Sequence, residues 1–106
     1  ARGDDHTYIL DKELGKLAIA SRCSSPKTGI VMEVYTDQPG VQLYTGNWMS
    51  GNLRGKHDHR YPARAALCLE TQHYPDSPNK PEYPSTRLNP GETFRSTTIF
   101  RFTLEA

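Results

Sequence analysis

The sequence predicts an all-β fold, a sandwich or barrel built from short strands. Apolar and polar residues alternate over several short segments, as they do where only one face of a strand is buried. The chain has eight glycines and eight prolines, and most of them fall between these segments, where they favour turns. No segment repeats apolar residues at helical spacing over three turns, so little helix is expected.

Five segments carry the strand pattern: residues 16–23, 29–36, 41–45, 65–70 and 94–104. In the first, Leu17, Ile19, Ser21 and Cys23 share one parity and would face the same way. The second alternates most clearly (GIVMEVYT), and the third follows the turn sequence DQPG. The fourth is the apolar run AALCL, which ends at Glu70. The last is indicated by the shared parity of its aromatic residues, beginning with Phe94.

Two long segments lack this pattern and are expected to be loops. Residues 46–61 contain three glycines and few apolar residues. Residues 75–90 contain four prolines spaced by three, which matches one edge of a polyproline II helix. That spacing fits a ligand of SH3 or WW domains, or an extended loop laid over a sheet and anchored by Tyr74 and Tyr83. The folded character of the flanking segments favours the loop.

The composition indicates one domain, or part of a larger one, with a lean core. The chain has 106 residues, of which 35% are hydrophobic. Counting glycine in place of tyrosine still leaves the apolar fraction well below the about 45–50% of an average globular domain. A small domain needs a rich core to be stable. We therefore expect this chain to share a core with a segment outside the 106 residues.

Charge and hydropathy argue against several classes of partner. Thirteen Lys and Arg against twelve Asp and Glu give a formal net charge of +1, so no broad basic field favours nucleic acid. No run approaches the roughly 20 apolar residues of a membrane span, and no signal-peptide pattern opens the chain. The first residue is Ala1 rather than Met, which suggests a processed or trimmed product. We expect a cytoplasmic protein with no nucleic-acid or membrane partner.

The two cysteines, Cys23 and Cys68, are expected to be buried or half-buried free thiols that pack as small hydrophobic residues. One disulfide is the alternative, but nothing else in the sequence indicates secretion.

Glu70 is the first candidate for chemistry. It follows an apolar run, and a carboxylate at the end of a buried strand would be partly desolvated and suited to general acid–base work. The alternative, which the sequence alone favours, is an ordinary exposed charge at a strand end.

Two further groups give weaker signals. Asp4-Asp5-His6 could bind hydroxyl groups, although a solvated turn is the simpler interpretation. His57 and His59 could meet one metal ion if the segment were a strand, but no further ligands are evident and we expect no metal site.

Amide side chains near aromatic residues indicate a possible sugar site. Gln42 and Asn47 flank Tyr44, and Trp48, the only tryptophan, lies in the same stretch. Amides supply donors and acceptors for sugar hydroxyls, and an aromatic ring offers a flat apolar surface. On physical grounds, a β-sandwich with such loops is a candidate for carbohydrate binding.

Four blocks of the sequence resemble the aldose 1-epimerase (galactose mutarotase) family. They are TDQPGVQLYTGN at residues 36–47, LCLETQHYPDSPN at 67–79, NPGE at 89–92 and TTIFRF at 97–102. The Asp5-His6 pair resembles the Asp-His pair that precedes these blocks in the family. The blocks occur in the family's order and extend over nearly the whole chain.

The resemblance implies a large galactose-mutarotase-like β-sandwich and an enzyme that interconverts the α and β anomers of free aldoses such as galactose or glucose, without a cofactor. It implies that Glu70 is the catalytic base and that Asp5 and Gln42 bind the sugar. Family members are much longer, so residues 1–106 would be the C-terminal part of the domain, and the N-terminal part would be its partner. The family's catalytic acid is a histidine on that earlier part, so the chain by itself is expected to be inactive. The alternative is a non-catalytic carbohydrate-binding β-sandwich module.

Overall fold

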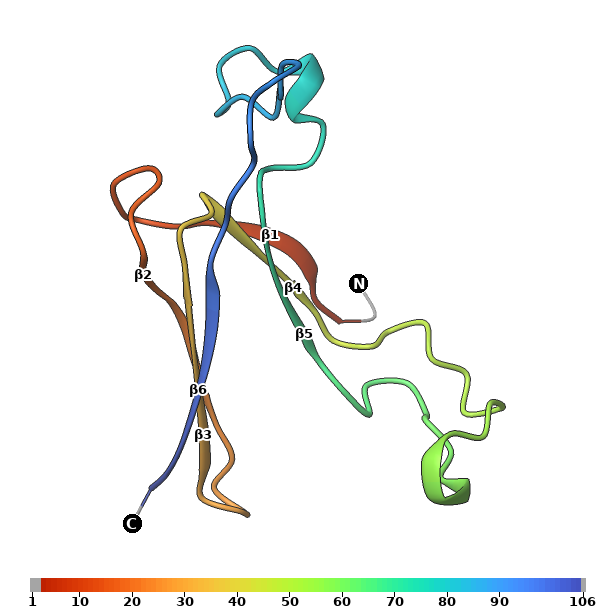
Figure 1. The fold of residues 1–106 in the computed structure, drawn as a ribbon. Coiled ribbons are helices and arrows are strands. Elements are labelled where there is room, and N and C mark those ends of the chain that lie inside the picture. Colours follow the sequence, from red (N-terminus) through yellow and green to blue (C-terminus); the bar gives the residue numbers. More distant parts are fainter. Residues whose placement is uncertain (1–2, 106) are drawn as a thin grey trace.

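The computed structural model describes residues 3–105, which form two antiparallel sheets (Figure 1). The strands are β1 (Asp5–Ile9), β2 (Ala18–Ser24), β3 (Ile30–Thr36), β4 (Gly40–Tyr44), β5 (Cys68–Gln72) and β6 (Thr98–Leu104). Two 3-10 helices, η1 (Lys56–Asp58) and η2 (Ser77–Asn79), lie in the loops. One sheet has the strand order β1-β4-β5 and the other β2-β3-β6. The predicted all-β class is confirmed.

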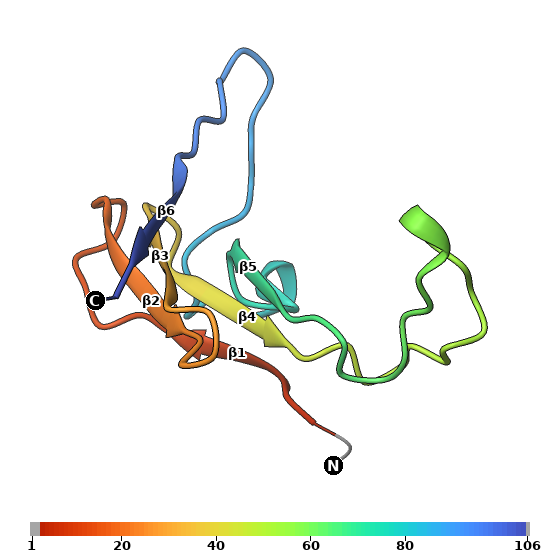
Figure 2. The ribbon, with the colours of Figure 1, turned by 90° about the horizontal axis from the view of Figure 1, so that it is seen from below.

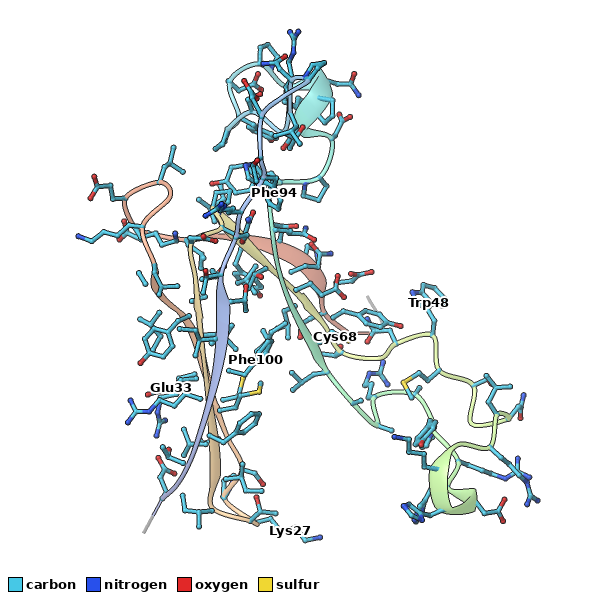
Figure 3. The ribbon with its side chains drawn as sticks, viewed as in Figure 1. Lys27, Glu33, Trp48, Cys68, Phe94 and Phe100 are labelled. Atoms are coloured by element: carbon cyan, nitrogen blue, oxygen red, sulfur yellow. The ribbon has the colours of Figure 1, made fainter. Side chains whose placement is uncertain are left out.

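Strand β3 is the centre of the second sheet and separates its two faces. Val34 of β3 is opposite Phe100 of β6, so their side chains share one face. Glu33 is opposite Arg101 on the other face, where the two side chains form an ion pair of 3.5 Å. Figure 3 shows Phe100 and Glu33 on opposite sides of this sheet.

The core lies where the two sheets meet. Val34 of β3 and Val41 of β4 are at most 3% exposed, and Thr36 is fully buried. Hydroxyl groups join the sheets here, because Thr71 Oγ1 of β5 is 2.6 Å from Thr98 Oγ1 of β6. Thr98 Oγ1 is in turn 3.3 Å from Thr36 Oγ1. A small apolar cluster and a chain of hydroxyls therefore hold the sheets together.

Away from this contact the sheets diverge (Figure 1), and apolar side chains remain exposed. On β6, Phe100 is 49% exposed, Phe102 64% and Leu104 76%. The accessible surface is 8130 Å², whereas a compact monomer of 12.0 kDa would expose roughly 6000 Å². The radius of gyration is 16.7 Å, against about 13 Å for a compact domain of this length. The described residues therefore bury little apolar surface, as the lean composition indicated.

A β-bulge changes the expected faces of β2. Ile19 is opposite Tyr35, but Ser21 is opposite the next residue, Val34, so the register shifts between Ile19 and Ser21. An inserted residue moves the side chains after it to the other face of the sheet. The prediction that Ile19 shares a face with Ser21 and Cys23 is therefore wrong.

Two other strands begin later than expected. β5 begins at Cys68, and Leu67 before it is 48% exposed in the preceding loop. β6 begins at Thr98, the partner of Thr36 at the end of β3. Phe94, 63% exposed, has no strand to pair with, because β3 ends at Thr36. Both strands were predicted too long, because their apolar residues continue past the point where the neighbouring strand ends and can no longer pair with them.

The two expected loops are loops in the structure. Residues 46–67 leave the end of β4 and project away from both sheets (Figures 1 and 2). In residues 75–90, the rings of Tyr74 and Tyr83 meet edge to face at 5.2 Å, so Tyr83 within the proline-rich stretch contacts the tyrosine that immediately precedes it. Helix η2 and the left-handed Asp76 (φ 63°) interrupt any continuous polyproline II helix.

Both cysteines are free thiols, and they lie on different sheets. Cys23 in β2 is half-buried, but Cys68 in β5 is exposed, so its expected burial is wrong. Among residues 3–105, no helix is long and apolar enough to cross a membrane.

Candidate functional site

Three of the polar residues that the sequence singled out lie on one face of the β1-β4-β5 sheet. Glu70 of β5 is directly opposite Gln42 of β4, and Gln42 is directly opposite Thr7 of β1. Opposite residues in antiparallel strands have Cβ atoms about 4.5–5.5 Å apart. Thr7, Gln42 and Glu70 therefore form a row across the sheet. Asp5 is two residues from Thr7 on β1 and faces the same way.

The Gln42 side chain is held at both ends of its amide. Its Nε2 donates a hydrogen bond to Asp5 Oδ1 at 2.8 Å. Its Oε1 accepts a hydrogen bond from Thr7 Oγ1. Gln72 supports this arrangement, because its Nε2 is 3.3 Å from Thr7 Oγ1 and 3.5 Å from Gln42 Oε1. Sequence reasoning missed Thr7 and Gln72, although each is two residues from a residue that it did select.

Glu70 lies inside β5, which continues to Gln72, and its side chain is exposed. Among residues 3–105, no hydrogen bond or ion pair engages its carboxylate. The expectation of a partly desolvated carboxylate at a strand end is therefore wrong for the described residues, since nothing covers this face of the sheet. The exposed alternative describes Glu70 here, and the carboxylate is open to a ligand.

Asp5 begins a strand, so the expected turn at Asp4-Asp5-His6 is wrong. Asp5 pairs with Tyr44 at the end of β4. His6 pairs with Leu43 and therefore faces the opposite side of the sheet from Asp5. The β-prone Thr7-Tyr8-Ile9 was the available signal for this strand, but the charged residues before it obscured the pattern.

Asn47 does not offer its amide to a ligand. It is 8% exposed, its Nδ2 donates to the main-chain oxygen of Asp4 at 2.8 Å, and its Oδ1 accepts from Thr45 Oγ1 at 2.7 Å. The main chain of Thr45 also donates to the oxygen of Asp4 at 3.1 Å. Gly46 between them has a φ of 67°, a conformation that favours glycine. Asn47 and Thr45 thus clamp the chain that leads into Asp5.

One aromatic residue of this region, Tyr44, lies at the edge of the same face, and Trp48 lies on the loop that follows. Tyr44 is opposite Asp5 and shares its face. The Tyr44 hydroxyl accepts a hydrogen bond from the main-chain N–H of Trp48 at 3.2 Å, and Trp48 is 73% exposed. Figure 3 shows Trp48 on the loop that leaves β4.

The His57-Asp58-His59 segment is part of a tight turn rather than a strand. The two imidazole rings have centroids 6.5 Å apart, and Asp58 forms an ion pair with Arg54 at 2.6 Å. Within residues 3–105, no group of three or more His, Cys, Asp or Glu side chains could hold a metal ion.

A second polar cluster, which sequence reasoning missed, lies where the β3–β4 turn meets the segment before β6. His73 Nδ1 is 2.8 Å from Gln38 Oε1, and Gln38 Nε2 donates to Ser96 Oγ at 2.7 Å. Ser96 in turn donates to Asp37 Oδ1 at 2.7 Å. A cleft of about 600 Å³ lies beside this cluster. Because Gln38 is 7% exposed and its polar atoms are paired, the cluster is a structural tie between segments.

Comparison with known proteins places these residues in a family. The aldose 1-epimerase family profile matches residues 2–101. The chain belongs to the aldose 1-epimerase family. Over 102 residues it is 46% identical to galactose mutarotase of Mus musculus and 44% identical to that of Homo sapiens, and each match covers 96% of this chain. It is 35% identical over 107 residues to aldose 1-epimerase of Escherichia coli K12, which covers 98% of this chain.

The fold agrees with that assignment. The crystal structure of the GalM/aldose epimerase homologue from C. elegans superimposes with a TM-score of 0.82 at 26% identity and covers 95% of this chain. The predicted galactose-mutarotase-like sandwich is thus confirmed. The chain spans only about 30% of the length of these relatives and of that crystal structure.

Proposed function

We propose that this chain is the C-terminal part of an aldose 1-epimerase domain that interconverts the α and β anomers of free aldoses such as galactose or glucose. The observation that carries the proposal is the shared exposed face of Asp5, Gln42 and Glu70. β4 separates Asp5 from Glu70, and two strand spacings with a two-residue offset put their Cα atoms roughly 12 Å apart. A sugar ring placed over Gln42, between the two strands that bear these carboxylates, would lie within reach of both.

The proposed reaction consists of proton transfers. Glu70, as general base, removes the proton from the anomeric hydroxyl while an acid protonates the ring oxygen. The ring opens to the aldehyde, the C1–C2 bond rotates, and closure on the other face gives the other anomer. Asp5 and Gln42 hold the sugar hydroxyls during the rotation. Because no electrons are exchanged, we expect no cofactor.

The acid is proposed to come from outside the 106 residues. His6 faces the opposite side of the sheet from Glu70, and His73 is hydrogen-bonded to Gln38. The family resemblance assigns the acid to a histidine on an earlier segment. The same segment is proposed to cover the exposed apolar face around Phe100 and Phe102. The chain by itself is then an incomplete catalytic unit.

The test supplies the missing part from a relative. In mouse galactose mutarotase, the matched region is replaced by this chain, and polarimetry follows freshly dissolved α-galactose. We expect the chimera to accelerate mutarotation and the 106-residue chain to match the spontaneous rate. Glu70→Gln in the chimera should lower kcat by about 100-fold or more and leave galactose binding intact. Glu82→Gln, a change at an exposed carboxylate in the proline-rich loop, is the control. Full activity of the Glu70→Gln chimera would overturn the assignment of the base.

A non-catalytic sugar-binding module is the second candidate. It is favoured by one observation: among residues 3–105, the one histidine that lies in a strand, His6, faces the opposite side of the sheet from Glu70. Calorimetry of the 106-residue chain with galactose separates the two. Binding by the chain, together with a chimera that does not accelerate mutarotation, would support the module.

A further inference from the structure

We infer that Thr7 is a positioning residue that, together with Asp5, holds the Gln42 amide in one orientation, so that Gln42 and Asp5 present a donor beside an acceptor to two neighbouring sugar hydroxyls. The inference rests on the proposed function, because it concerns the same face. Neither composition nor motif pointed to Thr7; the register of β1 against β4 does.

The amide of glutamine has an acceptor end and a donor end, and a rotation of 180° exchanges them. In this structure the Oε1 end of Gln42 meets the Thr7 hydroxyl and the Nε2 end meets Asp5 Oδ1 at 2.8 Å. The reversed orientation would bring Oε1 against the Asp5 carboxylate, two acceptors without a proton between them. The hydrogen-bonding partners therefore favour one orientation.

Gln72 determines in which direction the Thr7 hydroxyl donates its hydrogen bond. A Thr hydroxyl has one proton to donate, and Gln72 Nε2, 3.3 Å away, donates to Thr7 Oγ1. The Thr7 proton is thus free for Gln42 Oε1. Donation runs in one direction, from Gln72 to Thr7, to Gln42 and then to Asp5. The acceptor end of Gln42 is occupied by its own protein.

Two polar groups remain open on this face, one N–H of Gln42 and Oδ2 of Asp5, since no hydrogen bond from residues 3–105 engages either. They belong to side chains already linked at 2.8 Å, so they lie side by side. A hydrogen-bond donor next to a carboxylate acceptor is complementary to two adjacent hydroxyls, one accepting and one donating. The ligand class is therefore an aldose with a vicinal diol at this point of the ring.

The decisive variant is Thr7→Val, which keeps a β-branched side chain in β1 and replaces the hydroxyl with a methyl group of similar size. In the mouse chimera we expect the KM for galactose to rise by about twofold to tenfold, the loss of one hydrogen bond. kcat should change by less than twofold, because Glu70 is untouched. Thr7→Ser should restore the KM. Thr103→Val, at an exposed threonine of β6 in the other sheet, is the matched control.

A double-mutant cycle separates positioning from a general structural role. If Thr7 acts through Gln42, Thr7→Val should have no further effect on KM in a Gln42→Ala background. An unchanged KM for Thr7→Val, a failure of Thr7→Ser to restore it, or a full additional effect in the Gln42→Ala background would each overturn the inference.

The outcome does not depend on turnover. If Glu70→Gln proves fully active, the proposed base is wrong, and the dissociation constant of galactose read by calorimetry still reports on Thr7. In the 106-residue chain itself, NMR of the Gln42 side-chain amide, assigned by its loss in Gln42→Ala, should show a shifted signal and faster solvent exchange in Thr7→Val. Identical spectra would contradict the hydrogen bond.

Discussion

The side-chain amide of Asn47 donates a hydrogen bond to the main-chain oxygen of Asp4 over 2.8 Å, from a position only 8% exposed. Asp4 immediately precedes Asp5, whose carboxylate is bonded to Gln42. A buried residue in the loop after β4 therefore fixes the point where β1 begins, and with it the position of a proposed sugar ligand.

Removing this clamp should weaken both the fold and the site. We expect Asn47→Ala to lower the free energy of unfolding of the mouse chimera by about 1–3 kcal/mol, because the Asn47 side chain, only 8% exposed, loses its hydrogen bonds to the main-chain oxygen of Asp4 and to Thr45 Oγ1. Urea denaturation measures this, and the KM for galactose should rise as Asp5 becomes less ordered. Asn52→Ala, at an exposed position of the same loop, is the control. Equal stability of the two variants would refute the clamp.

The sugar ligands should act on binding more than on turnover. Asp5→Ala and Gln42→Ala are each expected to raise the KM of the chimera about tenfold or more, since each removes a hydrogen bond that involves a charged group. Initial-rate polarimetry over a range of galactose concentrations gives KM and kcat separately. Asp11→Ala, in the exposed turn after β1, should behave as the unmodified chimera. Unchanged Michaelis constants for both variants would remove them from the site.

Gly40 should not tolerate a side chain. A Cβ there would lie 3.1 Å from the Tyr74 ring and 3.2 Å from Thr7 Cγ2, closer than ordinary contact on both sides. We expect Gly40→Ala to destabilise the chimera by about 1–3 kcal/mol through overpacking. Thermal unfolding measures the change. Removing the Tyr74 ring as well, in Gly40→Ala/Tyr74→Ala, should relieve the clash and make the effect of Gly40→Ala smaller than it is in the unmodified chimera. A neutral Gly40→Ala would mean that Tyr74 moves aside at no cost.

The exposed apolar face of β6 should distinguish the chain from the complete domain. Phe102 is 64% exposed and Leu104 76%. We expect the 106-residue chain to bind a hydrophobic dye and to self-associate in sedimentation experiments, and the chimera to do neither, because the added segment covers this face. Phe102→Lys should improve the solubility of the chain and lower the stability of the chimera. Strong dye binding by the chimera would contradict this covering.

Glu92 should titrate below the usual range of a glutamate. The main-chain N–H of Asn89 donates to its carboxylate at 3.0 Å, and the Asn89 side chain does the same at 3.0 Å, so both lower the pKa of Glu92. A lowered pKa means that the turn gains stability above the ordinary carboxyl pKa and loses it as the pH falls through the lowered value. Carbon NMR measures the titration. Asn89→Ala should raise the pKa part of the way, since its main-chain N–H remains.

Local patterns in the sequence predicted part of this structure. The alternation of residues in β3 was sufficient to predict that strand and its two faces, because successive side chains in any strand point to opposite sides. The bulge between Ile19 and Ser21 was not predictable, since it depends on how β2 meets β3. The exposure of Glu70 was the alternative that the sequence favoured, and it is confirmed. The apolar run before Glu70 does not bury it, because such a run predicts burial only where another element covers the strand. Thr7 escaped notice because its importance comes from a partner on another strand.

The register of β4 carries a consequence for how the chain folds. β4 is the middle strand of its sheet, and Thr7 and Gln42 are 35 residues apart in the chain. Each flanking strand must close a long loop before it gains a single ladder contact, and this entropic cost slows folding. No local hairpin among the described residues brings Asp5, Gln42 and Glu70 together, so all three meet only after both flanking strands have paired with β4. The proposed sugar site is therefore complete only when its whole three-stranded sheet is formed.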